Sequence, residues 1–203
     1  MALSTRDALV AAAVELMDAG GLDAVTLREV GRRAGVSHNA PYKHFAHKEA
    51  LLAAVAAAEI TRWGDAWTQI MARAAASGLA EDEVVREAVH DYVARAMAQP
   101  VRFKLVYRAW TTATEELSRA ATTTRSLLIQ LVVAAQRAGS LPGGDPERVT
   151  ALLMALAHGA VDLALTGHLS PTGKGRAGPA DLVDDLFRYL KQGQRGSVPI
   201  TGD

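Results

Sequence analysis

Apolar residues recur at helical spacing along most of this 203-residue chain, and polar or glycine-rich breaks separate the runs. The first run predicts a helix that begins after Ser4, where the sequence Ser-x-x-Asp is typical of an N-cap, and ends at Gly20. Its buried face would consist of Leu9, Ala13, Leu16 and Met17.

The same pattern continues to residue 192 without any stretch of strand-like alternation. Two short helices are expected within residues 26–48. Six longer ones are expected at about 47–76, 81–98, 100–110, 115–138, 146–166 and 180–192. The sequence thus predicts an all-α protein of about nine helices. The Gly- and Pro-rich segment 167–179 is expected to be a mobile loop.

Residues 26–48 have the features of a helix, a tight turn and a second short helix. Thr26 and Glu29 fit a capping box, Gly35 can provide a positive φ at the turn, and Ser37 is a good N-cap for the second helix. Five basic residues and one acidic residue lie here, whereas the whole chain has 22 of each. A local basic patch on a neutral protein is typical of a DNA-binding module.

About a dozen positions within residues 26–51 resemble the N-terminal domain of the TetR (tetracycline repressor) family of bacterial regulators. The similar positions are Thr26, Val30-Gly31, Ala34-Gly35-Val36-Ser37, Tyr42-Lys43-His44-Phe45, Lys48 and Leu51. The resemblance covers about residues 5–55. Gly31 departs from it, since Ala is usual there, and glycine should weaken the helix by about 1 kcal/mol. Pro41 is a less common choice within the second helix.

The resemblance implies a three-helix helix-turn-helix domain whose second short helix enters the major groove of DNA. We expect His38, Asn39 and Pro41 to meet base edges, because they lie near the start of that helix. Phosphate contacts are expected mainly from Lys43, Tyr42, His44, Thr26 and Lys48. The full predicted DNA-binding set is Thr26, Arg28, Ser37, His38, Asn39, Pro41, Tyr42, Lys43, His44 and Lys48.

Residues 1–47 would then form the helix-turn-helix domain and residues 48–192 a helical ligand-binding and dimerisation domain, followed by a flexible tail at 193–203. The resemblance implies that the last two helices pair with their copies in a homodimer. The predicted interface consists of Val149, Leu153, Leu156, Ala160, Leu182, Leu186 and Leu190. In the alternative interpretation, these apolar stripes face the core of a single copy.

The same domain is expected to bind a small apolar or aromatic effector in a cavity with a few polar groups. The candidate lining residues are Trp63, Trp67, Met71, His90, Phe103, Tyr107, Trp110, Met154 and His158. The alternative is that such a stripe of aromatic and Met residues is ordinary core. Ala157-His158-Gly159 also resembles the Trp-His-Gly signature of one TetR subgroup, with alanine in place of tryptophan.

Other chemistry has little support in the sequence. There is no cysteine, the longest apolar run (50–58) is too short to span a bilayer, and the N-terminus lacks a signal-peptide core. We therefore expect a cytoplasmic protein. The loop at 167–175 has the wrong spacing for a phosphate-binding loop, and His44 and His47 lack a third ligand, so no cofactor or metal is expected.

Together these features predict a ligand-responsive DNA-binding transcriptional regulator, most simply a repressor that binds an inverted-repeat operator as a homodimer. No catalytic residues are expected, and the protein should not be an enzyme. The alternative is a small helical carrier or enzyme that uses the aromatic cavity. The sequence leaves open which ligand and operator are used, and whether the ligand releases or promotes DNA binding.

Overall fold

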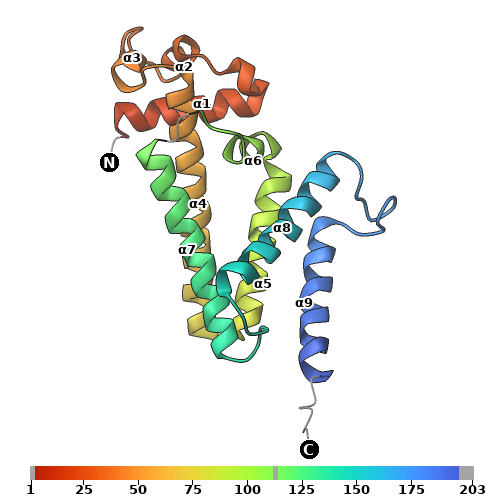
Figure 1. Ribbon diagram of the computed structural model, residues 1–203. Helices are drawn as coiled ribbons and strands as arrows, with labels where there is room; N and C mark the ends of the chain where they lie inside the picture. Colours follow the sequence, from red (N-terminus) through yellow and green to blue (C-terminus); the bar gives the residue numbers. More distant parts are fainter. Residues whose placement is uncertain (1–2, 112–113, 197–203) are drawn as a thin grey trace, which may run out of the picture. The chain divides into compact units, whose positions relative to one another are not determined.

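The computed structural model describes residues 3–111 and 114–196. Within these ranges the chain is all-α, as predicted, with nine α-helices and one 3-10 turn (Figure 1). They are α1 Thr5–Gly20, η1 Leu22–Ala24, α2 Leu27–Arg33, α3 Ala40–His44, α4 Lys48–Ser77, α5 Glu81–Ala98, α6 Pro100–Val106, α7 Glu115–Arg137, α8 Pro146–Leu165 and α9 Pro179–Gly196.

Several helices begin where the capping residues place them. The Ser4 Oγ accepts a hydrogen bond from the Asp7 N–H at 3.1 Å, and the Thr26 Oγ1 accepts one from the Glu29 N–H at 3.2 Å. Each of these bonds satisfies a backbone donor that would otherwise lack a partner in the first helical turn. The sequence prediction is confirmed for α1 and α2.

Two local predictions are wrong. Helix α3 begins at Ala40, and its N-cap is Asn39 rather than Ser37, because the Ala40 N–H donates to the Ser37 carbonyl in a separate turn at 2.9 Å. Helix α6 ends at Val106 instead of continuing to residue 110. Segment 167–179, which was expected to be a mobile loop, contains a turn in which the Ser170 N–H donates to the Lys174 carbonyl at 2.9 Å.

The C-terminal tail was expected to begin at residue 193. Helix α9 instead continues through Gly196. Residues 197–203, the rest of the expected tail, lie outside the described residues.

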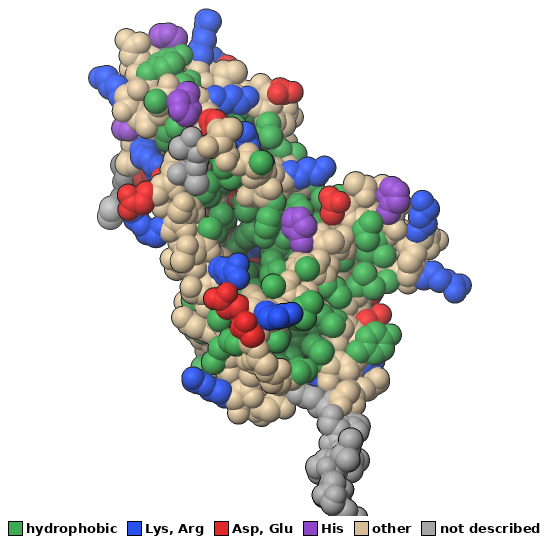
Figure 2. Space-filling view, in the orientation of Figure 1, with side chains coloured by type: hydrophobic (Ala, Val, Ile, Leu, Met, Phe, Trp, Pro, Cys, Tyr) green, Lys and Arg blue, Asp and Glu red, His purple; other side chains and the backbone are tan. Residues whose placement is uncertain are grey.

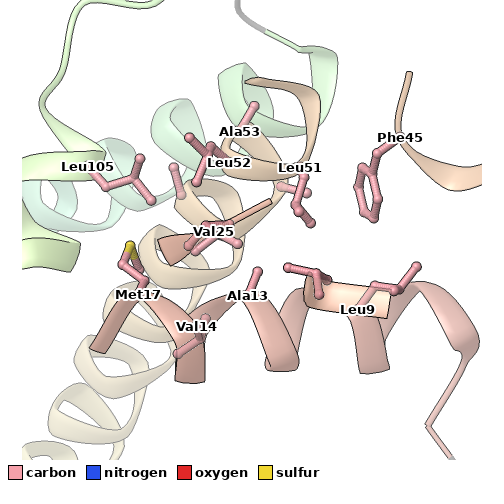
Figure 3. Packing of buried hydrophobic residues seen from close by; sticks show 14 of the residues in the cluster. Leu9, Ala13, Val14, Met17, Val25, Phe45, Leu51, Leu52, Ala53 and Leu105 are labelled. Atoms are coloured by element: carbon pink, nitrogen blue, oxygen red, sulfur yellow. The ribbon is translucent and has the colours of Figure 1, made fainter. Parts of the chain in front are cut away.

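The chain divides into two compact units, residues 1–63 with 99–124, and residues 64–98 with 125–203. The first unit contains α1–α3, the first half of α4, α6 and the start of α7. Its core is built on Leu9, Met17, Val25 and Phe45, which surround the α4 segment 51–57 (Figure 3). All seven residues of that segment are at most 3% exposed. The N-terminal helices thus share one core with the start of α4.

The second unit is organised around α5, α8 and α9, which contact one another. Tyr92 of α5, Leu153 and Val161 of α8, and Val183 and Phe187 of α9 are all at most 3% exposed. Charged side chains also join α5 to α9.

One helix among the described residues, α8, has the length and composition to cross a membrane, with a mean hydropathy of 1.4. Length and composition alone are weak evidence for a membrane span. Only 28% of the apolar window is buried within this chain. Helix α8 therefore presents apolar surface that its own chain does not cover.

Candidate nucleic-acid interface and effector site

The α2–turn–α3 motif is fixed by a small buried interface. Leu27 and Val30 of α2 are buried, Gly35 adopts the positive φ of 68° expected at the turn, and the Val36 N–H donates to the Gly31 carbonyl at 3.1 Å. These contacts set the position of α3 on α2.

Gly31 and Pro41, the two unusual residues of the motif, face each other. A Cβ atom added at Gly31 would lie 2.7 Å from Cγ of Pro41, which is closer than real Cβ contacts. Pro41 is buried in the first turn of α3, where its missing N–H leaves no helical hydrogen bond unmade. The absence of a Cβ at Gly31 therefore leaves the space that the Pro41 ring occupies, which explains why both unusual residues occur together.

Eight of the ten predicted DNA-binding residues are exposed around this motif. They are Thr26, Arg28, Ser37, His38, Asn39, Tyr42, Lys43 and His44. The His38 and Tyr42 rings meet edge to face, with centroids 6.0 Å apart. The surface formed by these residues is polar and basic, which suits a DNA backbone.

The other two predicted residues have structural partners. The ring of Pro41 is buried against Gly31, and Lys48 donates from Nζ to the Leu22 carbonyl at 2.6 Å. His47 caps α4, because its Nδ1 accepts from the Ala50 N–H at 3.2 Å.

Sequence reasoning missed one residue beside the motif. The Arg6 guanidinium lies 5.4 Å from the centroid of the Phe45 ring and also pairs with Glu116 of α7. No short-range pattern could have indicated the pairing, since Arg6 and Glu116 are 110 positions apart.

Four of the predicted effector residues lie in the first unit. Trp63 and Tyr107 are stacked with centroids 6.2 Å apart, and Phe103 lies 5.3 Å from Tyr107. Trp63 and Phe103 are buried, whereas Tyr107 is 47% exposed. Trp110 is covered by the Arg108 guanidinium at 4.7 Å. The structure therefore joins three of the four in one aromatic cluster with an exposed edge.

The other five lie in the second unit. Trp67 is 3% exposed, and its buried indole N–H has no hydrogen-bond acceptor among the described residues. His158 Nδ1 lies 2.9 Å from the hydroxyl of buried Tyr92, which the predicted set lacks. Met71 and Met154 are half-buried.

His90, the fifth, belongs to an ion-pair network between α5 and α9. Its Nε2 lies 2.8 Å from Oδ1 of Asp184, and Arg86 reaches the same oxygen at 2.8 Å. Burial raises the pKa of Asp184, but the hydrogen bonds from His90 and Arg86 outweigh it and hold that pKa below its ordinary value. A surface cavity of about 400 Å³ beside His90 contains none of the other predicted effector residues.

The predicted dimer residues divide into two groups. Leu153 and Ala160 are 2% and 3% exposed within the chain's own core, so for them the alternative of a core position applies. The half-buried remainder are Val149, Leu156, Leu182, Leu186 and Leu190.

The most exposed apolar residues of these two helices are not among the predicted interface residues. Leu152 is 70%, Leu163 46% and Tyr189 64% exposed. Figure 2 shows hydrophobic side chains gathered on this side of the molecule over α8 and α9. The spacing of Val149, Leu152, Leu156 and Leu163 at three, four and seven residues could have identified the exposed stripe of α8.

Two family models match this chain. The model for "Bacterial regulatory proteins, tetR family" matches residues 9–55, and that for "Tetracyclin repressor-like, C-terminal domain" matches residues 85–190. The second match alone spans more than half of the chain. A search of curated proteins found no match to this chain.

Solved structures share the fold over nearly the whole chain. A protein of unknown function from Rhodococcus sp. RHA1 is similar, with a TM-score of 0.79 and 29% identity over 95% of this chain and 96% of that one. FadR of Thermus thermophilus in complex with lauroyl-CoA has a TM-score of 0.66 and 18% identity over 98% and 100%. RolR in complex with resorcinol has a TM-score of 0.67 and 19% identity over 98% and 95%.

Proposed function

Since this chain belongs to the tetR family of bacterial regulatory proteins, we propose that it binds an inverted-repeat operator as a homodimer and that a small apolar or aromatic ligand changes its operator affinity. It is a ligand-responsive DNA-binding regulator and not an enzyme, so the interpretation as an enzyme is wrong. Residues 1–47 would bind DNA, and residues 48–192 would bind the effector and dimerise. A cytoplasmic location follows from this role.

The observation that carries the proposal is the exposed polar surface on the α2–turn–α3 motif. His38 and Asn39 lie in the turn before α3 and reach solvent, so they are the candidates for base edges. Lys43 is exposed on α3 and would meet a phosphate. The buried ring of Pro41 would hold α3 in place rather than read bases.

Binding to DNA from upstream of the protein's own coding sequence, measured by gel shift, tests this assignment. Asn39→Ala should lower discrimination at particular base pairs by about 1–3 kcal/mol. Lys43→Ala should weaken binding to every sequence alike and lower the salt slope by about 0.9. Unchanged sequence preference in Asn39→Ala would remove that residue from the base-reading set.

The homodimer is supported by the uncovered apolar stripes of α8 and α9. Leu152 and Leu163 on α8 and Tyr189 on α9 are too exposed to stabilise a single copy. A Cβ at Gly159 would meet nothing within 4 Å, so a second helix could approach α8 closely there. A two-fold axis through this surface would require an operator with inverted repeats.

Two separate features support an effector site: the aromatic cluster of Trp63, Phe103 and Tyr107 in the first unit, and buried Trp67 in the second. A buried indole N–H without an acceptor costs about 1–3 kcal/mol. A ligand that supplies an oxygen acceptor would remove that cost at Trp67. Lauroyl-CoA and resorcinol, which are bound by the similar proteins, both carry apolar or aromatic parts and oxygen acceptors.

Trp67→Phe tests this site, because it keeps an aromatic ring and removes the N–H. With resorcinol and lauroyl-CoA as probes, the variant should bind operator normally but respond more weakly to whichever probe acts on the wild type. Trp67→Ala should impair the response further. An unaltered response in both variants would exclude Trp67 from the site.

The narrower subgroup with a Trp-His-Gly signature stays a proposal. Only His158 and Gly159 support it, because Ala157 stands at the tryptophan position. Ala157 is fully buried.

A further inference from the structure

Two carboxylates of the first unit lie where each is unfavourable by itself. Asp18 is in the last turn of α1, where a negative charge opposes the helix dipole and no basic residue offsets it. Glu59 lies on the apolar part of α4 with its side chain only 4% exposed. Burying a carboxylate requires a partner, and Glu59 has two cations near it, Arg62 one turn farther along α4 and Arg102 of α6.

One guanidinium serves both carboxylates. Arg102 of α6 donates from Nε to Asp18 Oδ1 at 2.9 Å and from its second terminal nitrogen to Asp18 Oδ2, which makes a two-bond fork. Its remaining terminal nitrogen lies 3.6 Å from Glu59 Oε2. The Arg102 side chain is 15% exposed, so this contact is shielded from solvent. Arg102 therefore joins α6 to α1 and to α4.

Helix α6 also carries part of the aromatic cluster. Phe103 follows Arg102 directly, and Tyr107, which stacks on Trp63, follows α6 as its C-cap residue. The Phe103 N–H donates to the Gln99 carbonyl at 3.0 Å and the Tyr107 N–H to the Phe103 carbonyl at 3.4 Å. A rigid seven-residue helix with these attachments must move Arg102 whenever its aromatic residues move.

Two other polar contacts join residues 111–116, which follow α6, to α1 and to the start of α4, and both are more exposed. In the Arg6–Glu116 pair the side chains are 37% and 47% exposed, and Glu49 holds Thr111 through exposed hydrogen bonds. Exposed pairs contribute little to coupling because solvent screens them. Compared with these two contacts, Arg102 is better shielded, and it reaches the buried carboxylate of Glu59, which Arg62 also contacts.

We propose that Arg102 is a positioning residue that couples the aromatic cluster on α6 to helix α1 of the DNA-binding domain, through its fork to Asp18 and its contact with Glu59. This inference rests on the proposed function, since it assigns the route between effector and DNA. Coupling is reciprocal, so DNA bound to the protein must act back on α6. The coupling can therefore be measured without knowing the effector.

The test is amide hydrogen exchange of α6 in the full-length protein, with and without a saturating DNA duplex that the protein selects from fragments of its source genome. In the wild type, the duplex should slow exchange at Phe103 and Tyr107 by about fivefold or more. In Arg102→Gln and in Asp18→Asn, the change should fall below about twofold, although duplex binding is retained. Asp18→Asn is the safer variant, because Asp18 is 43% exposed and Arg102 keeps its contact with Glu59.

Arg119→Gln is the matched control, because it removes a guanidinium from an exposed pair with Glu115 on α7. Its α6 should respond to the duplex like the wild type. A wild-type-like response in folded Asp18→Asn, or a wild type that binds the duplex with no change at α6, would overturn the coupling while leaving the proposed function intact. Failure of the wild type to bind any duplex would overturn both.

Discussion

Two apolar helical segments of this protein differ sharply in burial. Residues 51–57 of α4 consist only of Leu, Ala and Val, and all are at most 3% exposed. Helix α8 is apolar enough to resemble a membrane span, yet Leu152 and Leu163 are 70% and 46% exposed. The apolar composition of a helix therefore does not show whether its own chain buries it.

The difference lies in the neighbours. The α4 segment belongs to a core cluster with residues of α1, α2 and α6, and its alanines let those helices approach closely. Helix α8 packs on α5 and α9, and the described residues leave its Leu152 and Leu163 side chains exposed. Under the proposed function, a second copy of the chain would cover this stripe.

The largest effect is expected from a charge on the uncovered face. Leu152→Asp should leave the isolated chain folded, because the side chain is already exposed, but in the dimer it would bury an unpaired charge at a cost of about 3–5 kcal/mol. Light scattering should show monomers, and operator affinity should fall strongly. Leu79→Asp, at an exposed apolar residue outside α8 and α9, is the control and should stay dimeric. A dimeric Leu152→Asp protein would exclude this face as the interface.

Truncation on the covered segment should act differently. Leu51→Ala should lower the free energy of unfolding by about 2–5 kcal/mol, since Leu51 is fully buried and its loss leaves a cavity. Urea denaturation at two protein concentrations checks this. The loss in Leu51→Ala should be the same at both, whereas that in Leu152→Ala should depend on concentration. The opposite pattern would reverse our assignment of the two surfaces.

A smaller effect is expected where α2 meets α3. Gly31→Ala gains about 1 kcal/mol of helix propensity but places its Cβ against Pro41. We expect no net stabilisation in the wild type and a gain of about 1 kcal/mol in a Pro41→Ala background. Thermal unfolding of the single and double variants measures this coupling. Equal effects in both backgrounds would show that the two residues are independent.

The smallest effect concerns the charged contacts between α5 and α9. A hydrogen bond from Lys191 holds the pKa of Glu83 below its ordinary value of 4.5. The stabilisation is therefore complete above that value and is lost as the pH falls through the lower, folded-state pKa. Lys191→Gln should reduce the dependence of unfolding free energy on pH between about 5 and 3. An identical acid profile in the variant would show that the contact adds nothing.

The regions predicted best from sequence are those whose structure is local. The starts of α1 and α2 follow from Ser4 and Thr26, whose side chains bond to backbone three residues ahead. Gly35 at the turn follows from its freedom to adopt a positive φ. The predicted start of α3 failed because the Ser37 carbonyl formed a separate turn, which competes with a helical cap at that position.

Pairings between distant segments could not be predicted. Arg102 could have paired with any of 22 acidic residues, and only the packing of α1, α4 and α6 selects Asp18 and Glu59. The same holds for His90, which the sequence placed among effector residues and the structure pairs with Asp184.

The sequence by itself determined the helices, the family motif and the basic surface around α3, because helical periodicity, capping and turn geometry act within a few residues. The tertiary structure alone decided which apolar faces are covered, that Pro41 fits against Gly31, and which carboxylates share Arg102. The physical reason is that burial and ion pairing depend on which helix faces meet in space, and residues far apart in the chain supply those faces.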